Sequence, residues 1–126
     1  FMNEKLFQDI FDKVQDYLPA DWEKMVFFAG YTDGSYSMKF YSRNNGAEYI
    51  DCFCLQGITK KMLIRLFMDI DKILAEERMS LDEKNRWTVF TMQVDSDGNM
   101  RTEFDYIDHT EDMVSYEREW KERYLL

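Results

Sequence analysis

The chain has 126 residues, which is enough for one domain with its own hydrophobic core, and we expect that domain to cover residues 2–126. Hydrophobic residues make up 45% of the chain, which excludes a disordered protein. Asp and Glu number 25 against 16 Lys and Arg, and the resulting net charge of −9 disfavours direct binding to nucleic-acid phosphates. Such a surface can instead attract a basic protein partner.

The ends and apolar runs of the sequence suggest a protein of the cytoplasm. Phe1 stands before Met2, so we treat it as an artificial addition and exclude it from the domain. The N-terminal residues do not form the basic-then-apolar leader of an exported protein, and no apolar run is long enough to cross a membrane. We therefore expect a cytoplasmic protein that does not bind membranes.

The first half of the chain predicts one helix and three strands. Apolar residues recur at helical spacing over residues 3–18, and the proline that follows ends this helix. Two aromatic segments, 24–32 and 35–42, flank an Asp-Gly pair and predict a β-hairpin. An Asn-Asn-Gly turn then leads to a third predicted strand at 47–55.

The second half predicts a long helix, a second hairpin and a final short helix. A threonine cap begins a helix over about residues 59–78. Strands are predicted at 86–94 and 99–107, joined by Asp97-Gly98 as a type I′ turn. The order α-β-β-β-α-β-β-α indicates an α+β fold, with a single antiparallel sheet of about five strands and helices packed on one face. Three tryptophans, Trp22, Trp87 and Trp120, are each expected to anchor a helix onto this sheet.

The cysteines and the histidine offer little for catalysis. Cys52 and Cys54 share one face of the predicted third strand, which disfavours a disulfide between them, so we expect free thiols in a reducing compartment. His109 is the single histidine, and we expect it in a polar loop exposed to solvent. With no nucleophile motif and too few Cys and His ligands for zinc, the sequence predicts no catalytic residue.

One acidic loop resembles a calcium site but is better explained as a turn. Residues 95–99 read Asp-Ser-Asp-Gly-Asn, whereas an EF-hand loop requires glycine at its sixth position and helices on both sides. Here glycine is the fourth residue and the flanking segments are predicted strands. We therefore interpret the segment as a hairpin turn and expect no metal ion and no cofactor.

The acidic residues concentrate toward the C-terminus, where residues 95–126 hold 10 acids against 4 bases. Alternation along the last predicted strand places Glu103 and Asp105 on an open acidic face, and Phe104 and Tyr106 on a buried aromatic face. Carboxylates in this pattern form a solvated surface, a docking site for a basic protein, or an acid/base or Mg²⁺ site. As a docking site, the contact region would comprise five residues: Glu103, Asp105, Asp108, Glu111 and Asp112.

Several segments together resemble one known family. They are LPADWEK at 18–24, WTVFT at 87–91 followed by DG at 97–98 and FDY at 104–106, and YEREWKERYL at 116–125. In order and spacing they resemble the YezG-like immunity proteins over nearly the whole chain. Between about residues 34 and 80 the resemblance is one of pattern alone.

This resemblance implies a bacterial cytoplasmic antitoxin that binds the C-terminal domain of a polymorphic toxin, delivered by contact-dependent inhibition or a related route. Toxins paired with this family are typically nucleases, often RNases. We therefore expect a non-enzymatic protein that forms a 1:1 complex with a basic nuclease domain and blocks its active site or substrate entry. The family motifs identify no toxin-binding residue, and homodimerisation stays open.

Two alternatives remain from the sequence. Type III secretion chaperones are also small, acidic and cytosolic, resemble this order of elements, and act as homodimers around an extended effector segment; the Trp-rich motifs favour the immunity protein. A small metal-dependent enzyme that uses paired carboxylates is the third hypothesis.

Overall fold

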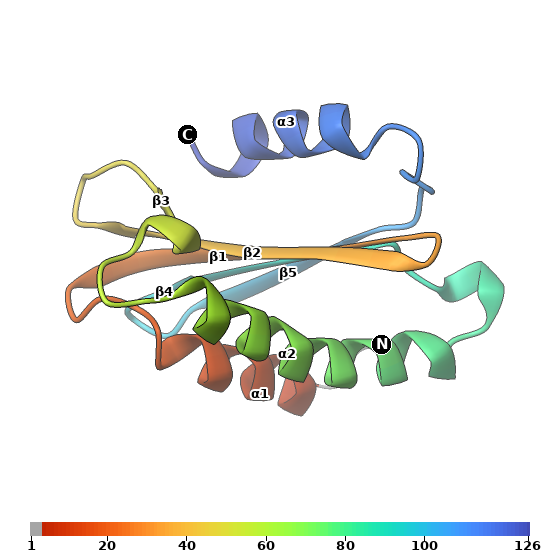
Figure 1. The fold of residues 1–126 in the computed structure, drawn as a ribbon, viewed down its shortest axis with the longest axis horizontal. Coiled ribbons are helices and arrows are strands. Elements are labelled where there is room, and N and C mark those ends of the chain that lie inside the picture. The colour runs from red at the N-terminus through yellow and green to blue at the C-terminus, as the bar shows by residue number, and fades with distance from the viewer. Residues whose placement is uncertain (1–3) are drawn as a thin grey trace.

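In the computed structural model, which describes residues 4–126, an antiparallel sheet is covered by helices on both faces. Figure 1 shows the sheet edge-on, with α1 and α2 on one side and α3 on the other. The sheet has five strands in the order β3-β2-β1-β4-β5, and the predicted α+β fold and order of elements are confirmed. The elements are α1 (Glu4–Gln15), β1 (Trp22–Thr32), β2 (Ser35–Asn44), β3 (Ile50–Asp51), η1 (Cys52–Cys54), α2 (Lys60–Ser80), η2 (Glu83–Asn85), β4 (Val89–Asp95), β5 (Met100–Asp105) and α3 (Met113–Tyr124). The expectations for Phe1 and for the first residue of the N-terminal helix lie outside the described residues.

β1 is the central strand, and its burial shows why both faces of the sheet need a cover. Its residues 25–31 are all buried, although successive side chains point to opposite faces. Phe27 belongs to the larger core beneath α1 and α2, whereas Phe28 belongs to a second core beneath α3. The prediction that helices pack on one face is therefore wrong for α3, because alternate residues of β1 are apolar on both sides.

The tryptophans connect helices to the sheet as predicted. Trp22 packs against Phe11 of α1, with ring centroids 5.9 Å apart. Trp120 of α3 meets Phe28 edge-on at 4.9 Å. Trp87 precedes β4 and accepts a hydrogen bond at its carbonyl oxygen from the Nε of Arg78 in α2, at 2.8 Å. Trp22 and Trp120 thus anchor their helices through ring packing, whereas Trp87 anchors α2 through its carbonyl oxygen and through its ring, whose centroid lies 5.4 Å from the Arg78 guanidinium.

The third predicted strand is mostly wrong. Only Ile50–Asp51 pair with β2, and the chain then turns into η1. The Asp51 carboxylate accepts a hydrogen bond from the backbone N–H of Phe53 at 2.9 Å, and this local bond begins the turn instead of extending the strand. Consequently Cys52 is buried and Cys54 is exposed, so the two free thiols do not share a strand face.

The two Asp-Gly hairpins form at the predicted positions, but the type I′ turn at Asp97-Gly98 is wrong. A type I′ turn requires positive φ at both central residues, and among residues 4–126 only glycines have positive φ. Asp95 provides the physical reason. Its carboxylate accepts hydrogen bonds from the backbone N–H groups of Asp97 and Asn99, both at 3.0 Å. These side-chain hydrogen bonds fix the backbone conformation of the turn. Gly98, at φ 94°, supplies the one left-handed residue.

Candidate functional site

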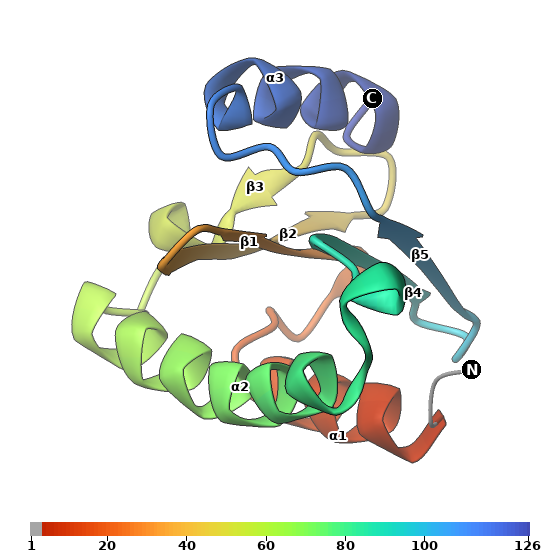
Figure 2. The same ribbon diagram turned by 90° about the vertical axis from the view of Figure 1, so that its right-hand side faces the viewer.

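Five acidic residues gather at one end of the sheet. There the tip of the β1–β2 hairpin and the C-terminal end of α2 meet the segment that joins β5 to α3 (Figures 1 and 2). We call residues 105–112 the acidic link. A surface cleft of about 930 Å³ lies between these elements, and five carboxylates and two guanidinium groups line it. The carboxylates are those of Asp33, Glu83, Asp108, Glu111 and Asp112, and the guanidinium groups are those of Arg78 and Arg86.

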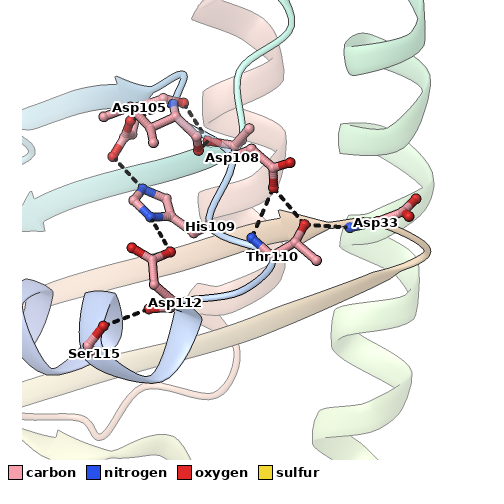
Figure 3. Close-up of polar contacts among 9 residues, drawn as sticks. Asp33, Asp105, Asp108, His109, Thr110, Asp112 and Ser115 are labelled. Carbon is pink, nitrogen blue, oxygen red and sulfur yellow. Dashed lines mark hydrogen bonds and ion pairs between the residues drawn. The ribbon is translucent and has the colours of Figure 1, made fainter.

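His109 is the centre of the acidic link and lies between two carboxylates (Figure 3). Its Nε2 is 3.1 Å from Asp105, at the end of β5, and its Nδ1 is 3.0 Å from Asp112, at the start of α3. The imidazole also stacks on Tyr116 of α3, with ring centroids 3.9 Å apart. The side chain is buried, so the prediction of a solvated loop residue is wrong. The three contacts come from residues within seven positions of His109, and the turn from β5 into α3 directs their side chains toward its ring.

The electrostatics of this contact favour the charged imidazolium. Burial opposes the charge, but the hydrogen bonds and negative charges of Asp105 and Asp112 outweigh it and raise the pKa of His109 above its ordinary 6.5. Burial likewise opposes the Asp105 carboxylate, but the Ile107 N–H and His109 outweigh it, so the pKa of Asp105 falls below 3.8. The protonated histidine therefore ties the start of α3 to the end of β5.

Further hydrogen bonds fix the backbone of the acidic link. Asp108 accepts from the backbone N–H and the hydroxyl of Thr110, at 2.9 and 2.6 Å. The same Thr110 oxygen accepts from the backbone N–H of Asp33 at 3.2 Å, which joins the link to the hairpin tip. On the sheet side, the Thr88 hydroxyl donates to the carbonyl of Ile107 at 2.6 Å. The link is thus held at the sheet, at the hairpin and at α3.

The five residues predicted from the sequence divide into two groups. Glu103 and Asp105 lie on the sheet face that α3 covers, where Glu103 is 3.3 Å from Arg123 of that helix. Their strand face is therefore not the open acidic surface that alternation predicts. Asp108, Glu111 and Asp112 line the cleft instead, and Asp112 also contacts His109.

The sequence missed other residues at this end of the molecule. Tyr106 is 57% exposed, contrary to the predicted buried aromatic face, because β5 ends at Asp105 and strand alternation stops there. Ile107 is also exposed, and Asp33 contributes its carboxylate from the hairpin tip. The Asp-Gly turn was recognised at Asp33, but nothing in the sequence indicates that this turn lies beside the acidic link.

The two arginines of the cleft make contacts with other residues of the chain. The guanidinium of Arg78 lies 4.4 Å from the ring of Tyr31, and that of Arg86 donates from Nη2 to the carbonyl of Leu81 at 2.8 Å. Both arginines line the cleft. Within residues 4–126, the carboxylates of Asp33 and Glu111 have no side-chain partner. With five carboxylates against two guanidinium groups, the cleft presents a net negative charge to an incoming group.

His109 has no ring nitrogen free for acid–base chemistry in this arrangement. Both ring nitrogens of His109 face carboxylates, so neither is available to take a proton from a substrate. In the part of the chain that the structure describes, no cluster of His, Cys, Asp and Glu has the arrangement of a metal site. Nor is any helix formed by residues 4–126 long and apolar enough to span a bilayer. An acidic cleft on a fixed backbone can complement a basic surface of another protein.

Comparison with known proteins agrees with this class. The model of the family "Immunity protein YezG-like" matches residues 3–125, and the chain belongs to that family. It is 26% identical to the immunity protein YezG of Bacillus subtilis (strain 168), over 91% of this chain and 81% of that protein. It is 24% identical to the type VII secretion system protein EsaG of Staphylococcus aureus (strain NCTC 8325 / PS 47), over 82% of this chain and 68% of that protein. The family match favours the immunity protein over the secretion chaperone that the sequence left open.

Proposed function

We propose that this protein neutralises a cognate toxin domain that is a nuclease, more specifically an RNase, by forming a 1:1 complex through its acidic end. Nuclease grooves are basic because they hold phosphates, so they attract a protein of charge −9. Binding of this kind would cover the active site or the path of the substrate without any catalytic step by the inhibitor. The complex would form in the bacterial cytoplasm, where the toxin domain would otherwise reach its nucleic-acid substrate.

One observation carries the proposal: the carboxylates of Asp33, Asp108 and Glu111 face one cleft from a backbone that is already fixed. Because the acidic link is held by hydrogen bonds before the partner arrives, little conformational entropy is lost on docking. Exposed carboxylates at the rim of an interface mainly raise the association rate, whereas buried apolar contacts lower the dissociation rate. The exposed side chains of Tyr106 and Ile107 lie in the same segment and supply the apolar contacts.

The test is the association rate with the cognate toxin domain, measured at two salt concentrations. The variant Asp108→Asn/Glu111→Gln removes two charges and keeps the oxygen that Thr110 uses. We expect an association rate about 3- to 10-fold lower and a weaker dependence on salt. The control Asp9→Asn/Glu48→Gln removes two exposed carboxylates elsewhere and should change the rate by less than about twofold. Equal effects of the two variants would refute docking through the acidic end.

A further inference from the structure

β5 forms one edge of the sheet, and its outer side has no partner strand within residues 4–126 (Figure 2). The strand pairs with β4 over all of its residues without a bulge, and it contains neither proline nor lysine. Bulges, prolines and lysines commonly keep the edges of natural sheets from pairing with other chains. The opposite edge is protected in another way, because β3 has only 2 residues. β5 is therefore the edge that can add a further strand.

Two backbone hydrogen bonds show which residues of β5 have free backbone groups. The carbonyl of Asn99 accepts from the N–H of Asp95 at 3.0 Å, and the carbonyl of Asp105 accepts from the N–H of Thr88 at 2.8 Å. The backbone groups of successive strand residues point to opposite sides, so the odd-numbered residues of β5 face β4. Three residues direct their N–H and C=O groups away from the sheet: Met100, Thr102 and Phe104.

The sequence of β5 is complementary to itself when two copies run antiparallel about a two-fold axis at Thr102. The two Thr102 residues then face each other, and Met100 of each copy faces Phe104 of the other. These are the residues with outward backbone groups, so each pair exchanges two hydrogen bonds. On the α3 side of the sheet, Arg101 of each copy lies opposite Glu103 of the other. Apolar pairs and opposite charges in such positions stabilise an antiparallel sheet.

Charge selects this register over the neighbouring ones. An axis at position 101 would place Arg101 opposite its own copy, and an axis at position 103 would do the same for Glu103. An axis at position 104 would set Glu103 against Asp105. Like charges destabilise a sheet when they lie directly opposite. Among these registers, the axis at Thr102 is the one that brings opposite charges together.

The edge has space for the second strand and apolar surface for it to cover. A cleft of about 340 Å³ lies between β5 and α3 and is lined by Glu103 and Arg123, which leaves room beside Glu103 for Arg101 of a second copy. On the other face, Met100 and Phe104 pack against the larger core but are only partly buried. A second strand would cover more of both side chains.

The charges at this edge are balanced, although the whole chain has a net charge of −9. Glu103 and Asp105 stand against Arg101 and Arg123, so two copies meet here without a local excess of one sign. We propose that β5 pairs with β5 of a second copy, in a homodimer with two-fold symmetry whose two sheets become continuous. This inference does not rest on the proposed toxin binding, because it concerns the chain alone.

Sedimentation equilibrium of the purified full chain tests the charge pairs. Arg101→Glu and Glu103→Arg each turn two attractive contacts per dimer into repulsive ones, so each should raise the dimer dissociation constant about tenfold. The double variant Arg101→Glu/Glu103→Arg restores opposite charges, and its dissociation constant should return to within about threefold of the original. The controls Glu48→Lys and Lys60→Glu reverse exposed charges on either side of β3 in the sequence and should change it by less than about twofold.

A second pair of variants tests the backbone pairing. Thr102→Pro removes an N–H that points away from the sheet, so the chain should keep its fold by circular dichroism while the dimer weakens about tenfold or more. Thr102→Val keeps the N–H and should leave the dissociation constant unchanged within about twofold. If Thr102→Pro does not fold, the charge variants decide.

A chain that stays monomeric up to about 1 mM overturns the proposal, since even a weak dimer forms there. It is equally overturned if the double charge variant dissociates like the single ones, or if folded Thr102→Pro dimerises like the native chain. A monomeric chain whose Thr102→Pro variant loses affinity for the cognate toxin domain would assign the edge to the toxin instead, which also contradicts the homodimer.

Discussion

His109 makes a sharp prediction, because its contribution to stability depends on one proton. His109→Gln keeps a polar side chain but removes the charge and one of the two contacts with carboxylates. A hydrogen bond to a charged group contributes about 1.5–3 kcal/mol. The Asp105 carboxyl is 25% exposed, so its contact with His109 contributes most of that stabilisation. Asp112 is 58% exposed, so its contact with His109 contributes little to stability. We therefore expect a loss of about 2 kcal/mol in the free energy of unfolding at pH 6.

The direction of the pH dependence follows from the raised pKa. A group whose pKa is higher in the folded than in the unfolded state contributes its full stability below the unfolded value and loses it as pH rises through the folded value. Because His109 is the single histidine, the native protein should be less stable at pH 8 than at pH 6. His109→Gln should be nearly equally stable at both values. The lowered pKa of Asp105 acts at the other end of the scale, where stability falls as pH drops through the folded pKa of this carboxyl.

Urea denaturation at pH 6 and pH 8 measures both effects. Asp112→Asn is the matched control, since it alters the exposed contact and should lose only a few tenths of a kcal/mol. The reasoning fails if the native protein is as stable at pH 8 as at pH 6. It also fails if His109→Gln shows the same decline, because then another group titrates.

Four further substitutions test how α3 and α2 are attached to the sheet, each by urea denaturation. Trp120→Phe removes the buried hydrogen bond from Nε1 to the Thr91 hydroxyl, which is 2.9 Å long, and should lower the free energy of unfolding by about 1–2 kcal/mol. Adding Thr91→Val to this variant should lower it little further, because the same bond is already lost. If the double variant instead loses the sum of the two single losses, this hydrogen bond does not explain them. Gly30→Ala should lower the free energy of unfolding by about 1–3 kcal/mol, because the added Cβ would lie 3.0 Å from the ring of Phe28 and 3.2 Å from the methyl group of Met113 in α3. A variant as stable as the native protein would show that the packing relaxes. Arg78→Lys should cost about 1–2 kcal/mol through loss of its bond to Trp87, and an unchanged midpoint would refute this role.

The parts of the fold that follow local rules could be predicted from the sequence. Thr59 caps α2 as expected, accepting the backbone N–H of Met62 at 3.1 Å. The hairpin joined by Asp33-Gly34 forms at the predicted position, with Thr32 opposite Ser35. Both features depend on residues a few positions apart, so the sequence pattern contains the information that determines them.

The features that the sequence could not predict depend on how α3 packs against the sheet. His109 is surrounded by polar residues and has no apolar periodicity, so only the docking of α3 on the sheet shows that it is buried between Asp105 and Asp112. Likewise, Glu103 alternates like an exposed strand residue until α3 covers it. The sequence did identify the acidic segment as a candidate site, but which carboxylates support the fold and which line the cleft depends on the tertiary arrangement.

The most direct test of the central claim is a titration of the cognate toxin domain with this protein while nuclease activity is followed. We expect cleavage of RNA to fall linearly and to reach background at one inhibitor per toxin, since a stoichiometric complex blocks the enzyme. Full activity at a large excess of this protein, or a toxin domain without any nuclease activity, would contradict the account.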